Sequence, residues 1–496
     1  MVDSISTSHF MNLTNFVSIA EDWMVNHVDY TTTPEPEISL FETTIRHVAG
    51  LVSAFELGGK TNKALIKQAT VLTDILLRAW QGTDVPYNTL VNWGPQTARP
   101  GDTSVNATLL IAEAGTILLE FDRLSKYSGN ATYKTYATKA MNALVRAQGD
   151  FAGLRFQEYY THYNSSLANA TRLTPASDFT SWGGGSDSFY EYLLKYPLLI
   201  GSPSSTYLAT WLSGVKSTIQ YLFQSPRGHT STFFLADAAD GDILPEYSHL
   251  ACFAPGNILL GAKTLGNAAL FGYGLKLAQG CVDSYRATAS GIGPEGWTYV
   301  LKDGSTNKVA YTDDAFSRRT GFSVSAPDYV LRPEVLESVF YAYRLTGDQK
   351  WADYAWDAFL AIKKACGTTD GSLAAIGDVT KARPQQVRVL AHPFSHFDSQ
   401  EMMLTALFLF LPRSTTCKAL PLPSCSSTSS SSFQTPLSAR WTSTSSTRRR
   451  IPLSARRPTF PPSRWARSRP RVCSHTILDK GPKKEEVRDG TKEDRT

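Results

Sequence analysis

The sequence has little cysteine and no long hydrophobic run. Six cysteines in 496 residues are too few to hold a chain of this length together by disulfides. A membrane-spanning helix needs about 18 consecutive apolar residues, and no such run occurs. Residues 1–22 also lack the basic and then apolar segments of a signal peptide. We therefore expect no membrane segment in this chain, and either a cytosolic protein or one whose natural start is missing.

The net charge of +5 is small and unevenly distributed. Residues 413–496 hold 18 Lys and Arg against 6 Asp and Glu, which leaves −7 for residues 1–412. A basic tail is thus joined to a mildly acidic body, and the pI near 8.7 does not indicate nucleic-acid binding. The tail is rich in Ser, Thr, Pro and Arg without periodicity. We predict that residues 413–496 are disordered, because such a segment cannot bury enough apolar area.

Strand-like alternation is scarce, whereas apolar residues recur at helical spacing. This pattern predicts helices over residues 39–57, 107–125, 187–196, 208–224, 333–345 and 350–363. Glycine turns separate them, and three junctions resemble one another: 57–60, 127–133 and 345–351. With 42% hydrophobic residues, the chain is predicted to be all-α, built of helical hairpins. A toroidal α/α barrel is favoured, and an open solenoid is the alternative.

Glycosylation sequons indicate an oxidising compartment. Five Asn-X-Ser/Thr sequons begin at Asn12, Asn106, Asn130, Asn164 and Asn169. Three cysteines lie in the tail, which leaves Cys252, Cys281 and Cys366 in the body. One disulfide with one free thiol fits these three residues, and three buried thiols fit them equally.

Acidic residues stand beside glycines, aromatics and prolines in several segments. Glu42 and Arg46 share a helix face, and such a pair on the surface contributes only about 0.3–0.5 kcal/mol. Asp187 follows a glycine turn at a helix start, where a carboxylate complements the helix dipole. Glu334 and Glu337 share one face after Pro333, which suits a first helical turn. Each segment alone therefore has an ordinary structural explanation.

Together, these segments resemble glycoside hydrolase family 47, the class I α-1,2-mannosidases, in their order and spacing. The stretches that carry the resemblance are Phe41–Arg46 with Gly50–Ala54, Ala112–Thr116 with Leu119–Phe121, Asp187–Lys195, His249–Gly256, Gly291–Glu295 and Leu331–Ser338. The resemblance implies an (α/α)7 barrel over residues 1–412. It also implies an inverting exo-α-1,2-mannosidase, a mannosyl-oligosaccharide hydrolase that trims high-mannose N-glycans in the secretory pathway.

The family's chemistry implies roles for individual residues. Inverting glycosidases protonate the leaving oxygen with a carboxylic acid and activate water with a carboxylate on the opposite face. The resemblance implies that Glu42 is the acid, with Arg46 holding its charge state, and that Glu334 is the base. Asp187 matches a third catalytic carboxylate, and Glu295 matches another acidic position. Crowding of carboxylates would raise the pKa of one of them, as an acid at neutral pH requires.

The resemblance also assigns binding residues and a disulfide. Residues that match the family's mannose-binding lining are Arg46, Glu113, His249, Arg332 and Glu337. Cys252 and Cys281 match the family's disulfide, which leaves Cys366 as a buried thiol.

Both ends of the chain depart from the family. Family members carry a signal or membrane anchor and a first barrel helix before the segment that corresponds to Val2–Thr7, where Ser6 replaces an Asp. After Glu401, Leu407 stands where a carboxylate is expected. The later Asn-Thr-Glu-Ala-His-Pro segment, whose Thr binds the essential Ca²⁺, does not follow. We interpret Ala391-His392-Pro393 as a coincidental match.

These departures predict a barrel that is incomplete at both ends, with Ca²⁺ as the family cofactor but no metal ligand in this chain. We therefore expect little or no hydrolysis by the chain as written. A shift of reading frame between Glu401 and Pro412 would explain the lost helix, the lost metal segment and the basic tail together. A genuine disordered tail is the other interpretation.

Two other functional classes compete with an enzyme. One is a mannosidase-like glycan-binding protein of glycoprotein quality control in endoplasmic-reticulum-associated degradation, and the other is a plain helical scaffold. The retention of three catalytic carboxylates favours the enzyme, because a binding module needs no matched acid and base. We expect high-mannose N-glycans as partners, no nucleic acid, and a monomer. The sequence does not distinguish the endoplasmic reticulum, the Golgi and the extracellular space as its location.

Overall fold

The computed structural model describes residues 1–161, 173–202, 205–308 and 310–387. By contacts the chain divides into Met1–Cys417 and Lys418–Thr496, and all described residues belong to the first unit. The predicted tail and the segment Ala391–Pro393 lie outside the described residues.

Helices make up most of the described chain. The α-helices are α1 (Ile5–Phe10), α2 (Thr14–Asn26), α3 (Leu40–Thr43), α4 (Ala49–Leu57), α5 (Lys63–Leu76), α6 (Ile111–Gly115), α7 (Leu118–Ser128), α8 (Thr132–Arg146), α9 (Asp187–Ile200), α10 (Thr206–Ser217), α11 (Ala254–Thr264), α12 (Ala268–Ala287), α13 (Ala315–Thr320), α14 (Glu334–Thr346) and α15 (Gln349–Cys366). Shorter turns are the π-helical η1 (Thr44–Val48) and η3 (Thr218–Leu222) and the 3₁₀ η2 (Leu77–Ala79) and η4 (Leu250–Phe253).

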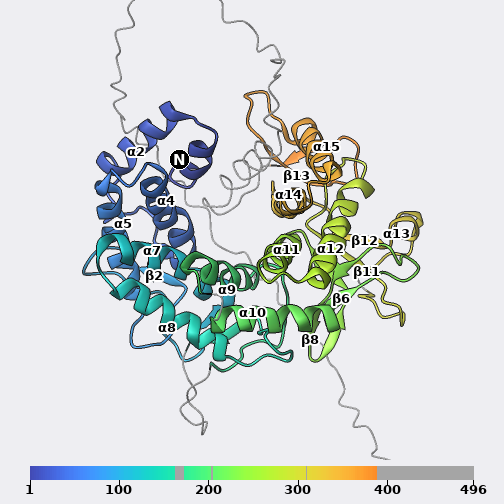
Figure 1. The fold of residues 1–496 in the computed structure, drawn as a ribbon, viewed down its shortest axis with the longest axis horizontal. Coiled ribbons are helices and arrows are strands. Elements are labelled where there is room, and N and C mark those ends of the chain that lie inside the picture. Colours follow the sequence, from blue (N-terminus) through green and yellow to red (C-terminus); the bar gives the residue numbers. More distant parts are fainter. Residues whose placement is uncertain (162–172, 203–204, 309, 388–496) are drawn as a thin grey trace, which may run out of the picture. The chain divides into compact units, whose positions relative to one another are not determined.

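The helices form an inner and an outer series (Figure 1). The inner helices α4, α7, α9, α11 and α14 contact one another in this order. Each is followed along the chain by an outer helix that packs on it, namely α5, α8, α10, α12 and α15. This alternation is the all-α toroidal arrangement of hairpins that the sequence predicts. Within residues 1–387 the series runs from α1 to α15 without closing into a complete barrel.

The three predicted helix–turn–helix junctions are confirmed between α4 and α5, α7 and α8, and α14 and α15. Gly129 ends α7 with φ of 78°, and Gly347 ends α14 with φ of 70°. This left-handed conformation is open to glycine without the steric cost that a Cβ brings. Asp348 then caps α15, where its side chain accepts a hydrogen bond from the backbone of Lys350 at 3.1 Å.

Short antiparallel strands occupy the connections between helices. Two three-stranded sheets have the orders β1 (Glu37–Ser39), β2 (Thr89–Val91), β3 (Arg99–Pro100) and β10 (Glu246–Ser248), β11 (Gly296–Tyr299), β12 (Phe322–Ala326). The two-stranded pairs are β4 (Thr108–Leu110) with β5 (Glu158–Tyr160), β6 (Phe223–Gln224) with β7 (Phe234–Leu235), β8 (Asp237–Ala239) with β9 (Asp242–Leu244), and β13 (Ala375–Ile376) with β14 (Gln386–Val387).

Two of the predicted helices are wrong in part. The helix predicted over 107–125 begins as strand β4, which pairs with β5, and it breaks at Thr116 between α6 and α7. The helix predicted over 208–224 ends at Ser217, passes through the π turn η3 and continues as β6. The partner strand of β4 lies about 50 residues away in sequence, and a local apolar pattern cannot detect such pairing.

Aromatic side chains fill much of the core between the two helix series. Among the largest fully buried side chains are Trp182, Trp211, Trp297 and Trp351. Trp211 of α10 donates a hydrogen bond to Asn257 Oδ1 of α11 at 2.6 Å. A Cβ at Gly261 would lie only 2.0 Å from the Trp211 ring, so only glycine lets α11 approach α10 this closely.

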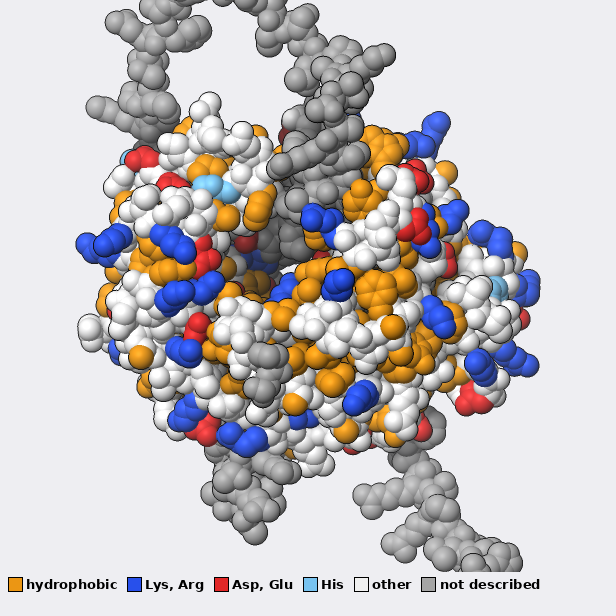
Figure 2. Space-filling view, in the orientation of Figure 1, with side chains coloured by type: hydrophobic (Ala, Val, Ile, Leu, Met, Phe, Trp, Pro, Cys, Tyr) orange, Lys and Arg blue, Asp and Glu red, His pale blue; other side chains and the backbone are white. Residues whose placement is uncertain are grey.

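The surface facing the reader in Figure 2 carries charged side chains of both signs, interspersed, with hydrophobic side chains gathered over α11 and α12. No single-sign stripe of the kind that binds nucleic acid crosses the described part of this face. Among the described helices, none has the length and apolarity needed to cross a bilayer.

Candidate active site

Four of the predicted carboxylates lie at, or shortly before, the starts of inner helices. Glu42 is in α3, just before the π turn that leads into α4, and Glu113 is in the first turn of α6. Asp187 is the first residue of α9, and Glu334 is the first residue of α14. Because each inner helix returns through an outer one, successive inner helices run in the same direction and their N-terminal ends meet at one rim. The positive ends of the helix dipoles favour carboxylates there.

Glu42 forms an ion pair with Arg46, which in turn contacts Asp3. Arg46 Nε lies 2.6 Å from Glu42 Oε2, and Arg46 Nη1 lies 3.0 Å from Asp3 Oδ2. Arg46 belongs to the π turn Thr44–Val48, a type of local irregularity that is frequent at functional sites. The predicted Glu42–Arg46 pair is therefore present, and Asp3 extends it into a three-residue cluster.

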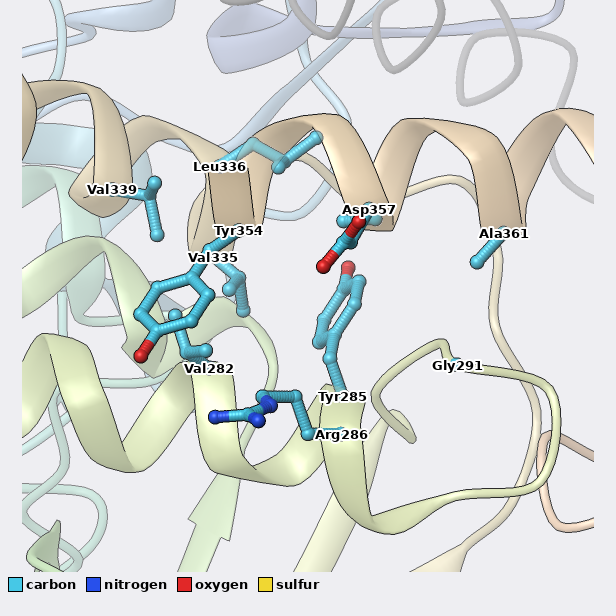
Figure 3. A pocket seen from close by; sticks show the side chains of 11 residues that line it. Val282, Tyr285, Arg286, Gly291, Val335, Leu336, Val339, Tyr354, Asp357 and Ala361 are labelled. Atoms are coloured by element: carbon cyan, nitrogen blue, oxygen red, sulfur yellow. The ribbon is translucent and has the colours of Figure 1, made fainter. Parts of the chain in front are cut away.

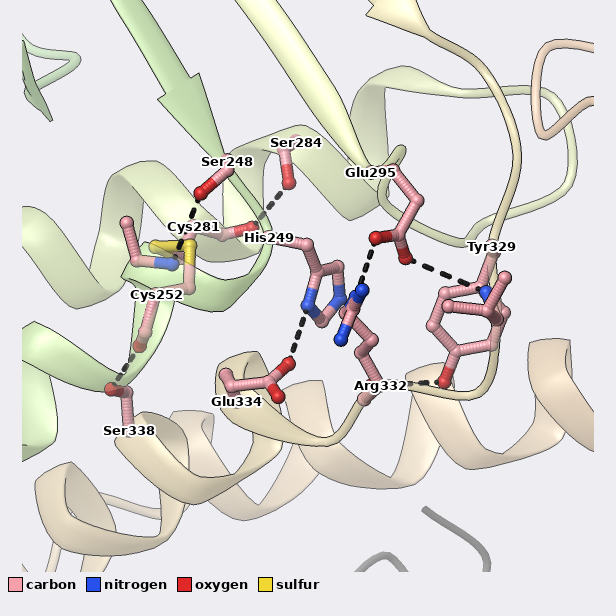
Figure 4. Close-up of polar contacts among 12 residues, drawn as sticks. Ser248, His249, Cys252, Cys281, Ser284, Glu295, Tyr329, Arg332, Glu334 and Ser338 are labelled. Atoms are coloured by element: carbon pink, nitrogen blue, oxygen red, sulfur yellow. Dashed lines mark hydrogen bonds and ion pairs between the residues drawn. A yellow bond between two sulfur atoms is a disulfide. The ribbon is translucent and has the colours of Figure 1, made fainter. Parts of the chain in front are cut away.

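Glu334 is held by a buried histidine (Figure 4). His249 Nδ1 lies 2.9 Å from Glu334 Oε2, and His249 Nε2 lies 2.8 Å from the hydroxyl of Tyr285. The His249 side chain is fully buried, whereas 15% of the Glu334 side chain is exposed. Tyr285 lies on α12, far from either partner in sequence, and no sequence pattern marks it.

Glu295 forms an ion pair with Arg332 through Arg332 Nε (Figure 4). Its backbone also contributes, because Glu295 O accepts a hydrogen bond from His249 N at 2.9 Å. Glu295 N donates to Asp328 O at 3.0 Å. Glu295 thus ties the segment before Glu334 to the segment that carries His249.

The backbone just before Arg332 is strained. Leu331 is buried and has φ of 67°, a conformation that costs a non-glycine residue about 1–2 kcal/mol. The Tyr329 hydroxyl donates to Arg332 O at 3.1 Å and helps to hold this geometry. The strain therefore lies three residues before Glu334, the first residue of α14, and directly before Arg332, which pairs with Glu295.

Burial perturbs two of the rim carboxyls. Burial raises the pKa of Asp187 to about 7, with smaller contributions from Glu191 and Glu334, against hydrogen bonds from Ser188. Burial and the nearby Glu42 raise the pKa of Glu113 to about 7. Burial is thus the main cause of both pKa shifts, and the repulsion between carboxylates that the sequence analysis invoked adds a smaller part.

A half-buried lysine lies near these carboxylates. Lys195 of α9 forms an ion pair with Glu191, and the pKa of Lys195 is raised because Glu191, Tyr341 and Glu337 outweigh its burial. Burial raises the pKa of Glu337 to about 8, with Lys195 opposing this shift. The sequence analysis assigned no role to Glu191 or Lys195. Their spacing four and eight residues after Asp187 on one helix face was the available signal.

The structure contains the disulfide Cys252–Cys281 and a buried free thiol at Cys366. The described residues contain no group of three His, Cys, Asp or Glu side chains arranged to hold a metal ion.

An apolar cavity of about 110 Å³ lies behind the rim, between α12, α14 and α15 (Figure 3). Val335, Leu336 and Tyr285 are among the residues that line it. Tyr285 therefore contacts both this cavity and the buried face of His249.

Comparisons with known proteins agree with the fold. Curated relatives named mannosyl-oligosaccharide α-1,2-mannosidase come from Coccidioides posadasii, with 35% identity over 76% of this chain and 71% of the relative, and from Penicillium citrinum, with 33% identity over 82% of this chain and 76% of the relative. Among solved structures, an α-1,2-mannosidase from Trichoderma reesei matches with a TM-score of 0.73 and 32% identity over 83% of this chain and 85% of that chain. A cellobiose 2-epimerase from Spirochaeta thermophila, at 12% identity, shares the fold alone with a TM-score of 0.52 over 81% of this chain and 98% of that chain.

The helical toroid with carboxylates at its rim, together with these relatives, identifies the chain as a glycosidase. The sequence model of glycosyl hydrolase family 47 matches residues 1–390, and the chain belongs to that family.

Proposed function

We propose that this chain is an inverting exo-α-1,2-mannosidase that removes terminal mannose from high-mannose N-glycans. The observation that supports this most directly is the pairing of two rim carboxylates with fixed partners, Glu42 with Arg46 and Glu334 with His249. Hydrolysis with inversion needs a proton donor and a base on opposite faces of one sugar. Carboxylates on separate inner helices can supply both.

In the proposed mechanism Glu334 is the base. Its carboxylate accepts a proton from a water molecule, whose oxygen attacks C1 of the mannose as the bond from C1 to the leaving oxygen breaks. The buried His249 fixes the orientation of Glu334, because its other ring nitrogen is held by Tyr285. Glu42, held by Arg46, delivers the proton to the leaving oxygen, and Asp187 is the third catalytic carboxylate.

The remaining rim residues bind and position the substrate. We assign mannose hydroxyl contacts to Arg46, Glu113, Arg332 and Glu337. His249, which the resemblance placed in the same lining, is fully buried with both ring nitrogens occupied, so in this scheme it positions Glu334. Glu295 is a positioning residue in this scheme, because its carboxylate is occupied by Arg332 and its backbone by His249 and Asp328.

A calcium requirement is part of the proposal only because the family resemblance implies it. The described residues supply no set of direct metal ligands, and no step above passes through an ion. Location in the secretory pathway is likewise part of the proposal. The disulfide Cys252–Cys281 and the exposed sequons at Asn12, Asn106 and Asn130 support an oxidising, glycosylating compartment.

The test is an incubation of a high-mannose N-glycan with the purified chain in molar excess, with NMR detection of the first anomer released. Terminal α-1,2-mannose should appear initially as β-mannose, and Glu334→Gln should abolish this signal. Initial release of α-mannose, or equal release by the variant, would contradict the mechanism. Tight glycan binding with no release would instead support the glycan-binding alternative.

A further inference from the structure

The turn between α1 and α2 presents a glycosylation sequon whose acceptor side chain has no competing contact. Asn12 is exposed, with φ of 57°, a left-handed conformation that Asn adopts more readily than most residues. The turn is fixed by backbone hydrogen bonds from Asn12 N to His9 O at 3.0 Å and from Leu13 N to Ser8 O at 2.9 Å. Among the described residues, no hydrogen-bond partner occupies the Asn12 side-chain amide. By contrast, Asn130 Oδ1 accepts a hydrogen bond from Thr132 N at 3.0 Å.

A groove of about 280 Å³ begins at this asparagine. This volume is close to the lower end of pockets that hold small molecules, about 300 Å³. Asn12 and Thr14 of the sequon line it, together with Ser8, His9, Ser18 and Glu21. Hydroxyl, imidazole and carboxylate groups suit the hydroxyls and the acetamide of an amino sugar.

One further feature of the groove and one exposed residue near the acceptor suit a sugar. His9 Nε2 is buried without a hydrogen-bond partner among the described residues, and the nearest oxygen of Glu21 lies 3.7 Å away. A buried polar atom without a partner costs free energy that a ligand can recover. Phe10 is not part of the groove lining, but it lies two residues before the acceptor and is 62% exposed, and an aromatic ring of this kind can cover the apolar face of a sugar.

We propose that Asn12 is N-glycosylated and that the first N-acetylhexosamine of this glycan lies in the groove, against Phe10 and His9. In the modification, Asn12 Nδ2 forms a bond to C1 of the reducing-end sugar of a lipid-pyrophosphate-linked oligosaccharide. The bond from C1 to the pyrophosphate oxygen breaks, the lipid pyrophosphate leaves, and Nδ2 loses one proton. The proposal depends on entry into the secretory pathway and not on mannosidase activity, so either can fail alone.

The first experiment measures occupancy. The full chain is secreted from yeast behind a secretion leader, and the peptide that contains Asn12 is analysed by mass spectrometry. We expect the mass of one glycan on this peptide, its loss in Asn12→Gln and in Thr14→Ala, and its retention in Thr14→Ser. A secreted chain with unmodified Asn12 would overturn the proposal. The Thr14 variants keep the test decisive if Asn12→Gln folds poorly.

The second experiment tests the contact with the groove. In a background with Asn106, Asn130, Asn164 and Asn169 changed to Gln, the glycan is either trimmed to its first sugar or removed completely. Trimming should leave Tm unchanged, and complete removal should lower it. Phe10→Ser should abolish this difference, whereas Ile19→Ser, at a similarly exposed residue (63%) on α2 that is farther from the acceptor in the sequence, should preserve it. An identical Tm for the trimmed and fully deglycosylated chains would show that the sugar does not occupy the groove.

Discussion

His249 Nδ1 lies 2.9 Å from Glu334 Oε2, and the two residues are 85 positions apart in the sequence. The histidine is fully buried on a segment tied to Glu295, whereas the glutamate begins α14 at the rim. The other ring nitrogen, His249 Nε2, lies 2.8 Å from the hydroxyl of Tyr285. The proposed base is therefore oriented by a chain of two side chains from two other parts of the fold.

Substitutions of Glu334 and Tyr285 should reduce activity to different extents. Glu334→Gln should reduce kcat by about 10²–10⁴-fold, the usual contribution of a general base. Tyr285→Phe removes one buried hydrogen bond, worth about 0.5–1.5 kcal/mol, and should reduce kcat/KM by at most about tenfold. Single-turnover release of mannose measures both. Equal losses in the two variants would argue that Tyr285 does more than orient His249.

Asp187 should make stability depend on pH. Its pKa of about 7 lies above the ordinary 3.8, so the folded chain binds this proton more tightly than the unfolded chain does. This contribution to stability is complete below about pH 4 and is lost as pH rises through about 7. Tm should fall between pH 5 and pH 8 in the native chain and fall less in Asp187→Asn. Parallel Tm profiles for the two proteins would refute the assignment.

Loss of the Glu295 carboxylate should leave Arg332 misplaced and so weaken substrate binding. Because Glu295 holds the Arg332 guanidinium without acting on substrate in our scheme, Glu295→Gln should raise KM more than it lowers kcat. Arg332→Lys is the matched variant, since a lysine cannot reproduce the planar guanidinium. A fall in kcat with KM unchanged in Glu295→Gln would instead return Glu295 to the catalytic group.

Calcium should have little effect on this chain. The sequence lacks the Asn-Thr-Glu-Ala-His-Pro segment of the family, and the described carboxylates form no direct metal site. Steady-state mannose release should therefore be slow, and similar with added Ca²⁺ and with a chelator. Restoring the family segment after residue 401 is the matched control and should make release fast and Ca²⁺-dependent. Clear Ca²⁺-dependent turnover by the unaltered chain would contradict the prediction.

The disulfide should stabilise the part of the site that carries His249. Cys252 and Cys281 are 29 residues apart in the sequence. A disulfide that closes a loop of this length lowers the entropy of the unfolded chain and so stabilises the fold by about 3–4 kcal/mol. Changing both to Ala should lower Tm, as should a reductant. Adding the reductant to the double variant should cause no further change. A native chain whose Tm is insensitive to reductant would show that this bond contributes little.

Much of the fold and several contacts of the site could be predicted from local sequence. The glycine junctions defined the hairpins, because a left-handed helix end is decided within a few residues. The Glu42–Arg46 pair is present as its i,i+4 spacing predicts, and the Cys252–Cys281 disulfide is present as the family resemblance implied. Strand β4 was predicted as helix because its pairing with β5 spans a long sequence separation.

The sequence by itself determined the helical hairpins and the family, since each depends on neighbouring residues or on ordered motifs, and it supplied the candidate carboxylates of the site. Only the tertiary structure decided the partners of those carboxylates: Asp3 for Arg46, Tyr285 for His249, and Lys195 beside Glu337. It also decided which carboxyl groups bind protons near pH 7, because burial sets those pKa values and depends on packing between distant helices.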